Sequence, residues 1–279
     1  MIQKYDFIFR ILFIVIFYIN EINSQQRIET RIFMIHTQNK EIILRDAYAE
    51  SYDRELIKIR TLFGKAAEKN TVLAHLKPEK NDSILDAGCG TGIYTIETAK
   101  LVHDLMAIDF SSSSIDILNK KLKTAQINNS STKVGDLALM ELPPNRFDKA
   151  MSIEVIQHIP THQKRVLALQ NIFNALKPGG KFVMVVYRYG GWIKYPKPKE
   201  ELDHAGVGLY RFAFEEKDVR QIFTQVGFHV EFIGGVLNIR NKIRKRLPPW
   251  LSFVDVWISK IGISRKYGDL LLVVGRKPL

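Results

Sequence analysis

The sequence predicts an α/β fold with a mostly parallel sheet and helices on both faces. Short apolar runs at about 83–87, 104–109 and 131–135 alternate with helical stretches, and this alternation is typical of parallel strands joined by helices. In addition, a glycine-rich stretch, Asp86-Ala87-Gly88-Cys89-Gly90-Thr91-Gly92, follows the first run and opens a helix at about 93–102. Ligands of such sheets bind beyond the carboxyl ends of the strands, so this loop marks the candidate site.

The amino-acid composition is that of a globular protein with an uneven distribution of charge. The chain has 279 residues, of which 46% are hydrophobic and 25% charged, as in ordinary globular proteins with a sizeable core. Its net charge of +12 is uneven, because residues 238–279 carry ten Lys or Arg against two Asp. This basic region suggests an anionic partner. The only cysteine is Cys89, which excludes an internal disulfide and fits a reducing compartment.

The first 33 residues form an apolar extension. Residues 7–19 are apolar except for Arg10, and this run is shorter than the ~20 residues of a membrane-spanning helix. Three interpretations stay open: upstream or dispensable sequence before a start at Met34, a membrane-associating segment, or an export signal with a poor cleavage site at 22–24. Residues 34–80 are then expected to form an N-terminal helical cap, which ends at Lys77-Pro78.

The glycine loop has physical consequences. Glycine can adopt a positive φ and lets a ligand lie against the backbone, while the first turn of the following helix offers free N–H groups. About 20 residues later the next strand ends at Asp109, where nucleotide-binding βαβ units place the acid that holds ribose hydroxyls. The loop lacks the Gly-x-Gly-x-x-Gly spacing of a dinucleotide site.

Three motifs together resemble those of class I S-adenosylmethionine (SAM)-dependent methyltransferases, with a domain of the methyltransferase type 11/25 kind. They are the glycine loop that begins at Asp86, the strand end at Asp109, and Val134-Gly135-Asp136. The resemblance covers residues 48–188 well. It implies a Rossmann-like sheet of seven strands in the order 3-2-1-4-5-7-6, a methyltransferase domain over 81–279, and SAM as the cofactor.

The resemblance also implies roles for single residues. Asp86 would lie near the methionine ammonium, Asp109 would accept hydrogen bonds from both ribose hydroxyls, and Asp136 with the backbone of Leu137 would meet the adenine amine. Phe110 is predicted either to stack on adenine or to pack in the core. The full predicted cofactor set is Asp86, Gly88, Cys89, Gly90, Gly92, Asp109, Phe110, Asp136, Leu137 and Ser152. For Cys89 we expect packing rather than thiol chemistry.

Two side chains after the fourth strand, at about 147–153, are candidate bases. In the stretch from Ser152 to His158, Glu154 and His158 are the nearest titratable groups to the methionine part of the cofactor, and either can accept a proton from an oxygen nucleophile. A nitrogen nucleophile needs no base, and for His158 we favour the alternative of a turn residue that fixes the loop. His158 and His162 are four residues apart, but Pro160 lies between them, so we expect no metal site.

Two further segments are expected to bind the methyl acceptor. Tyr48 and Tyr52 share one helix face in a stretch that lies over the cofactor in related enzymes. The segment 188–213 follows the fifth strand and faces the methyl donor in this family. The candidates are Tyr187, at the end of the fifth strand, and Arg188, Trp192 and Arg211 within the segment. The two aromatic side chains would form walls of the site, and the two arginines would contact an anionic group of the substrate. Simple packing or loop anchoring is the alternative for all of them.

An insertion at 236–268 precedes the last strand. Ile239, Ile243 and Leu247 recur every four residues among the cations of Arg240 to Arg246, so a helix here would carry an apolar stripe beside a basic face. Such a helix suits an anionic membrane surface or an RNA backbone. The alternative is a cap whose apolar stripe packs on the domain.

The sequence therefore predicts methyl transfer from SAM to a small or lipid-linked metabolite by a cytoplasmic enzyme with a possible membrane association. The alternative enzyme methylates RNA, in the manner of wobble-uridine tRNA methyltransferases. The alternative of another class is a non-catalytic SAM-binding or membrane-associated partner protein.

Overall fold

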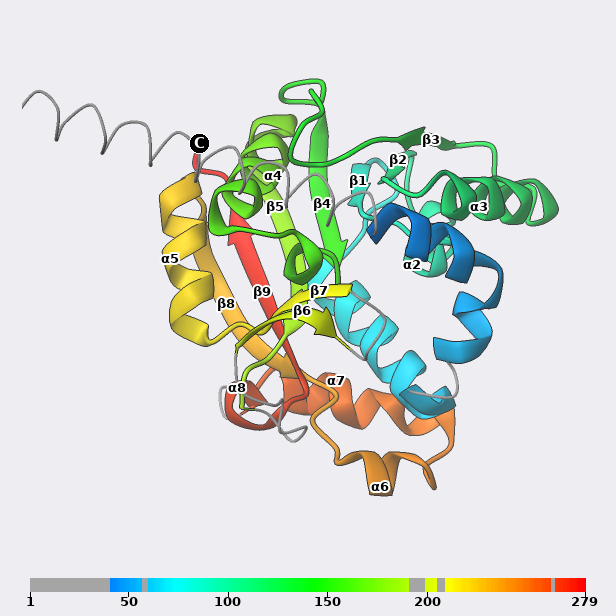
Figure 1. The fold of residues 1–279 in the computed structure, drawn as a ribbon, viewed down its shortest axis with the longest axis vertical. Coiled ribbons are helices and arrows are strands. Elements are labelled where there is room, and N and C mark those ends of the chain that lie inside the picture. The colour runs from blue at the N-terminus through cyan, green and yellow to red at the C-terminus, as the bar shows by residue number, and fades with distance from the viewer. Residues whose placement is uncertain (1–40, 57–59, 191–198, 205–208, 262–263) are drawn as a thin grey trace, which may run out of the picture. The chain divides into compact units, whose positions relative to one another are not determined.

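The computed structural model describes residues 41–56, 60–190, 199–204, 209–261 and 264–279. Residues 42–279 form one compact unit (Figure 1). The predictions for residues 1–33 and for Trp192 fall outside the described residues.

Two helical segments, 41–56 and 60–76, precede the sheet. The elements that follow are β1 (Ser83–Ala87), α2 (Ile93–Ala99), β2 (Asp104–Asp109), α3 (Ser112–Thr124), β3 (Ser130–Val134), β4 (Phe147–Ile153), η1 (Ile156–His158), α4 (His162–Ala175), β5 (Leu176–Tyr187), β6 (Glu200–His204), β7 (Leu209–Phe212), α5 (Glu216–Val226), β8 (His229–Val236), α6 (Asn241–Arg244), η2 (Pro249–Ser252), α7 (Phe253–Ser259), α8 (Ser264–Tyr267) and β9 (Leu270–Arg276).

Seven strands form the main sheet, in the order β3-β2-β1-β4-β5-β9-β8. The first five are parallel, whereas β9 runs antiparallel to both β5 and β8. This topology confirms the predicted Rossmann-like fold and strand order. Because β1 and β2 are parallel neighbours, with Ala87 opposite Ile108, the acids at their carboxyl ends lie at the same edge of the sheet.

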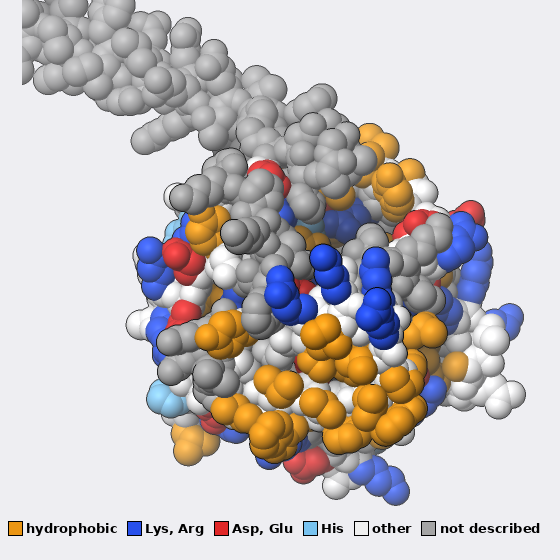
Figure 2. Space-filling model, turned by 90° about the horizontal axis from the view of Figure 1, so that it is seen from below, with side chains coloured by type: hydrophobic (Ala, Val, Ile, Leu, Met, Phe, Trp, Pro, Cys, Tyr) orange, Lys and Arg blue, Asp and Glu red, His pale blue; other side chains and the backbone are white. Residues whose placement is uncertain are grey.

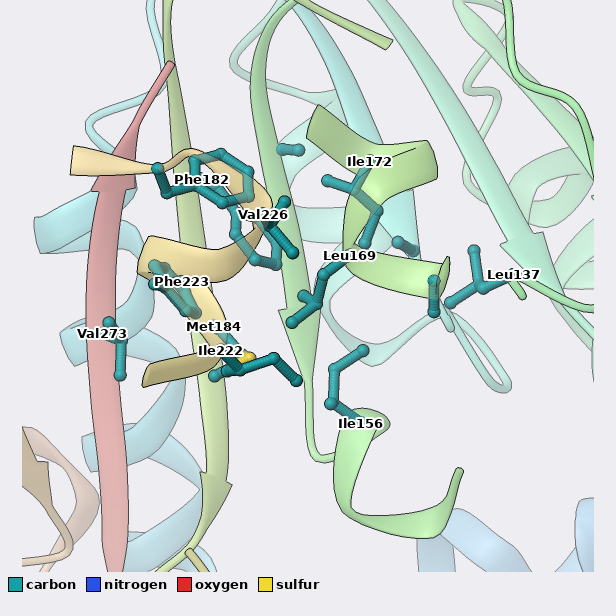
Figure 3. Close-up of a cluster of buried hydrophobic side chains, with 14 of the residues drawn as sticks. Leu137, Ile156, Leu169, Ile172, Phe182, Met184, Ile222, Phe223, Val226 and Val273 are labelled. Carbon is teal, nitrogen blue, oxygen red and sulfur yellow. The ribbon is translucent and has the colours of Figure 1, made fainter. Parts of the chain in front are cut away.

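Side chains that alternate along the strands fill a core on each face of the sheet. On β5, Phe182 and Met184 point to one face and Val183 to the other. The first face is covered by α4 and α5, which contribute Leu169, Ile172, Ile222, Phe223 and Val226 (Figure 3). The second face is covered by α2, α3 and the segment 60–76. Strands β1 and β9 are mostly apolar because both of their faces are buried, whereas the edge strand β3 is polar and largely exposed.

The insertion before β9 differs from the prediction of an amphipathic helix. Helix α6 has only four residues, and Pro248 and Pro249 follow it closely. Ile243 is 52% exposed, while Arg244 is buried and its Nη2 lies 2.6 Å from Asp269 Oδ2. The predicted stripe is therefore wrong at its centre, because a buried carboxylate at the start of β9 draws the neighbouring cation inward.

Within the described part of the chain, no helix is both long enough and apolar enough to cross a membrane. The predicted division into a cap at 34–80 and a domain at 81–279 stays a prediction. The segment 60–76, however, packs Phe63 and Leu76 into the same core as the sheet.

Candidate active site

The loop between β1 and α2 is fixed to the neighbouring strand by its backbone. The N–H groups of Gly88 and Cys89 both donate to the carbonyl oxygen of Ile108, at 2.7 and 2.9 Å. Gly88 has a φ of +86°, and a Cβ built on it would lie 2.2 Å from a methyl group of Val155. Gly90 has a φ of +53°, and a Cβ there would meet no atom within 4 Å among the described residues. The loop thus packs tightly at Gly88 and is open at Gly90.

Asp109 and Asp86 lie beside this loop and are both buried. Asp109 Oδ2 accepts a hydrogen bond from the Gly90 N–H at 2.8 Å, and its Oδ1 accepts one from the Ser111 N–H at 3.0 Å. Burial raises the pKa of Asp109. The Thr95 hydroxyl donates to Asp86 Oδ2 at 2.6 Å. Burial, with a smaller contribution from the charge of Asp109, raises the pKa of Asp86 to about 7.

The remaining predicted cofactor residues border the same edge of the sheet. Asp136 follows β3, and its Oδ1 accepts from the Ala138 N–H at 2.8 Å in an Asx turn. Leu137 is buried in the core of the α4 side, and Phe110 is half-buried. The Ser152 hydroxyl donates to the carbonyl of Ala87 at 2.8 Å, which ties β4 to β1. Cys89 is buried, and burial raises the pKa of its thiol.

The helical segment 41–56 is fastened over the loop by two carboxylates. Asp53 accepts from the Thr91 hydroxyl at 2.6 Å and pairs with Lys121 Nζ at 2.5 Å. Asp46 accepts from the Ser111 hydroxyl at 2.5 Å. These bonds hold the helical segment that carries Tyr52 beside the loop, and contact of Tyr52 with a bound ligand stays a prediction. Asp46 was not predicted, and no spacing in the sequence marks it.

Glu154 lies directly after β4 and begins a second group of side chains. Its N–H donates to the carbonyl of Val185 at 2.8 Å, and it adopts a φ of +59°. Arg60 Nη2 lies 2.5 Å from Glu154 Oε2, and Arg60 Nη1 lies 3.4 Å from Glu68 Oε2. The Tyr94 hydroxyl donates to Glu68 at 2.7 Å. Sequence reasoning missed Arg60, Glu68 and Tyr94, because they come from two helices with no motif.

Electrostatics in this group favour a neutral Glu154. Burial, opposed by the cation of Arg60 and reinforced by the charge of Glu68, raises the pKa of Glu154 to about 8. A hydrogen bond between Tyr187 and Glu154 acts in the opposite direction. Burial and the nearby charge of Glu154 also raise the pKa of Tyr52 to about 12. Glu154 therefore sits among two tyrosines and one arginine with a proton affinity suited to acid–base chemistry near neutral pH.

His158 reaches the same group from η1. Its ring meets the ring of Tyr187 edge-on, with centroids 5.6 Å apart, and its Nδ1 lies 2.8 Å from the carbonyl oxygen of Tyr210. Tyr187 thus contacts both predicted bases.

Gln157, which precedes His158 in the chain, is fully buried. Neither its amide nitrogen nor its amide oxygen has a hydrogen-bond partner within the described residues. Gln157 is a further polar group that a ligand could satisfy.

The predicted arginine contacts have partners inside the fold. Arg188 is buried, and its Nη1 donates to the Gly268 carbonyl at 3.4 Å. Arg211 is fully buried, and its Nη2 lies 2.6 Å from Glu201 Oε2 in the β6–β7 hairpin. Their binding to a substrate anion stays a prediction, as does the wall role of Tyr48, which is exposed at the surface. Among the described residues, no group of His, Cys, Asp or Glu side chains could hold a metal ion.

Comparison with known proteins agrees with this geometry. A family model described as a methyltransferase domain matches residues 84–180, the part that runs from β1 to the start of β5. Residues 84–180 thus match a methyltransferase domain, and the chain has the fold of SAM-dependent methyltransferases. Its fold is shared with a SAM-dependent methyltransferase of Thermotoga maritima, described as a possible histamine N-methyltransferase, at a TM-score of 0.63 and 17% identity, over 85% of this chain and 99% of that one.

A second solved structure is the 1,6-didemethyltoxoflavin-N1-methyltransferase of Burkholderia thailandensis, which holds its substrate and S-adenosylhomocysteine. It matches at a TM-score of 0.58 and 19% identity, over 85% of this chain and 88% of that one. At such identities these likenesses show the fold of the methyltransferase domain and not its acceptor.

Sequence relatives are named for quinone chemistry. The chain is 29% identical over 102 residues to a ubiquinone biosynthesis O-methyltransferase of Coxiella burnetii. The matched stretch covers 37% of this chain and 42% of that protein. It is 26% identical over 182 residues to a demethylmenaquinone methyltransferase of Staphylococcus aureus, 57% of this chain and 73% of that one. The match to the Coxiella relative thus spans less than half of that relative's length.

The residues of the methyltransferase domain fit SAM on structural grounds. The face of the loop at Gly90 is open, so a ligand can approach the backbone there. Two buried carboxylates, Asp86 and Asp109, adjoin that opening, and the two backbone hydrogen bonds of Asp109 leave lone pairs on its oxygens for hydroxyl donors. An amine and a ribose diol are the groups of SAM that such acceptors suit.

Proposed function

We propose that the chain transfers a methyl group from SAM to a small or lipid-linked metabolite and releases S-adenosylhomocysteine. The observation that carries the proposal is the intact loop of Gly88 to Gly92 with Asp109 anchored to it, next to the buried group of Glu154, Arg60 and Tyr187. Bound SAM supplies a methyl group that is already activated by its sulfonium. The chain's own residues then position the acceptor and exclude water.

Glu154 is our candidate for the proton acceptor. Its neighbour Val155 packs against Gly88, so Glu154 is held one residue from the cofactor loop. An oxygen acceptor must lose a proton when it gains the methyl group, and an ionised Glu154 can accept that proton. His158 is the second candidate, because it contacts the same tyrosine ring. A nitrogen acceptor with a free lone pair would need neither residue.

The names of the relatives support a quinone-like acceptor class. Tyr52 and Tyr187 flank Glu154 and offer aromatic faces and hydroxyls, which suit a planar phenolic ring. RNA as the acceptor remains the alternative. A non-catalytic SAM-binding protein is the alternative of another class. Cytoplasmic location and an anionic partner for Arg240 to Arg246 also stay predictions.

A labelled methyl group tests the proposal. The full chain is incubated with methyl-labelled SAM and an extract of the source cells, and the label is partitioned into lipid, small-molecule, RNA and protein fractions. We expect label in the lipid or small-molecule fraction, and none with Asp109→Ala. Label in RNA would replace the proposal with the RNA alternative. SAM binding without any transfer would favour the non-catalytic alternative.

A further inference from the structure

The helix α7 is folded with its polar face inward. Ser252 just before it, Asp255 and Ser259 are buried, whereas Phe253 and Trp257 are 59% and 66% exposed. A helix on a globular domain normally buries its apolar stripe and exposes its polar one. The inverted arrangement leaves two large aromatic side chains on the surface, one turn apart.

Specific bonds hold the polar face in place. Asp255 accepts hydrogen bonds from the N–H groups of Leu237 and Asn238, at 3.0 and 2.7 Å, where the chain leaves β8. The Asn70 amide donates to the Ser252 hydroxyl at 2.9 Å, which joins α7 to the segment 60–76. Rotating the helix to bury its aromatics would break these buried bonds and leave the Asp255 carboxylate without its N–H donors. The aromatic face is therefore a fixed outer surface.

Two more apolar side chains and five cations extend this surface. Trp250 in η2 is 71% exposed and Ile243 in α6 is 52% exposed. The exposed cations of the same stretch are Arg240, Lys242, Lys245, Arg246 and Lys260. The only acid between residues 240 and 261 is Asp255, which is buried. Seen from the side of α6 and α7, hydrophobic side chains gather in one area with a row of Lys and Arg along its border (Figure 2).

We propose that this surface, formed by η2, α6, α7 and Lys260, docks on an anionic lipid bilayer. Tryptophan and phenylalanine are suited to the boundary between headgroups and acyl chains, and Lys and Arg beside them attract anionic headgroups. A second copy of the chain fits less well, because the cationic borders would face each other. An RNA backbone would pair with the cations but would leave Ile243 and Phe253 in water. The proposal does not depend on which acceptor is methylated.

Quenching by lipid tests the docking locally. Full-length chain with Trp192→Phe retains only Trp250 and Trp257 as emitters. It is added to phosphatidylcholine vesicles with acyl-brominated chains, with and without about 30% phosphatidylglycerol, a fraction that gives a negative surface potential. We expect quenching of the tryptophan emission with the anionic vesicles and its loss as salt is added. Because the signal comes from the surface itself, attachment through residues 1–40 does not mimic it.

Matched variants separate the contributions. Lys245→Ala and Arg246→Ala should each weaken vesicle binding in the quenching titration about fivefold. The control Lys120→Ala, which removes an exposed cation on α3, should leave the binding unchanged. Trp257→Ala should weaken it more than Leu139→Ala, which removes a side chain that is also exposed. Unquenched tryptophans in vesicle-bound protein would overturn the proposal. Equal quenching by neutral vesicles would also overturn it. The same holds if these variants lose binding to tRNA but not to vesicles, or if the chain forms a dimer in solution that Trp257→Ala dissociates.

Discussion

Arg60 and Glu154 form an ion pair that joins the helical segment 60–76 to the end of β4, with Nη2 and Oε2 2.5 Å apart. The same guanidinium lies 3.4 Å from Glu68. The side chains of Arg60, Glu68 and Glu154 are only 11%, 5% and 16% exposed, so one arginine meets two acidic side chains away from water. We propose that this group borders the acceptor site.

Removing the cation should destabilise the fold. Arg60→Met leaves Glu68 and Glu154 close together without their shared partner, and we expect the free energy of unfolding to fall by about 3–5 kcal/mol. Chemical denaturation measures it. At a pH of about 9, where Glu154 is ionised, Arg60→Met combined with Glu154→Gln should regain part of the loss, because one buried charge is gone. A loss below about 1 kcal/mol in the single variant would show that the pair behaves like a surface ion pair.

The pKa of Glu154 predicts a pH profile for an oxygen acceptor. Glu154 accepts a proton only when ionised, so kcat/KM should rise about tenfold per pH unit up to its pKa of about 8 and level off above it. Glu154→Gln should lower kcat by about 10²–10⁴-fold and remove the rise. An unchanged profile in Glu154→Gln would exclude this residue as the base.

The raised pKa of Glu154 also predicts how the free energy of unfolding changes with pH. Folding raises the pKa of Glu154, so the native state binds the proton more tightly than the unfolded chain does. The stabilisation from this group is fully present below the unfolded pKa of about 4.5 and is lost as the pH rises through about 8. Denaturation midpoints of the unmutated chain and Glu154→Gln should therefore diverge as the pH rises from 5 to about 9, with the variant becoming relatively more stable.

Two glycines of the loop should respond differently to a methyl group. Gly88→Ala combines a positive φ with a Cβ 2.2 Å from Val155, and we expect a loss of about 2–4 kcal/mol in the free energy of unfolding. Gly90→Ala meets open space and should lose only about 1–2 kcal/mol, while its Cβ enters the ligand side and weakens SAM binding. Val155→Ala should partly rescue Gly88→Ala. Equal losses of stability would contradict the packing at Gly88.

SAM binding should depend on the ionisation of Asp86. Burial raises the pKa of Asp86 to about 7, and the methionine ammonium of SAM would favour its charged form. Affinity should therefore fall below pH 7, and binding at pH 6 should release close to one proton. Calorimetry in buffers of different ionisation enthalpy measures the release, and Asp86→Asn should abolish it. Proton release that persists in Asp86→Asn would assign the effect to another group.

The sequence alone predicted what depends on local pattern. The strands at 83–87, 104–109 and 147–153, the glycine loop, and the acids at the ends of β1 and β2 follow from apolar runs and short spacings. Asp86 and Asp109 were predicted as cofactor residues because each has a fixed place relative to the loop. Which way a lone polar side chain points is not encoded in this way.

The missed features all depend on contacts between distant segments. Arg60 meets Glu154 across 94 residues, and Asp53 meets Lys121 across 68. Arg244 turns inward because Asp269 is buried beside it, which a count of apolar residues around a helix cannot reveal. Arg211 was predicted from its residue type, but its nearest described partner is Glu201 on the paired strand.

The most direct test of the central claim is a calorimetric titration of the full chain with SAM. The account predicts that the unmutated chain binds SAM with one site, and that Asp109→Ala binds about 100-fold more weakly or worse, since two hydrogen bonds to a charged acceptor are lost. Asp116→Ala, an exposed acid on neighbouring α3, serves as the control and should bind as the unmutated chain does. Equal affinity in Asp109→Ala, or no binding of SAM by the unmutated chain, would contradict the account.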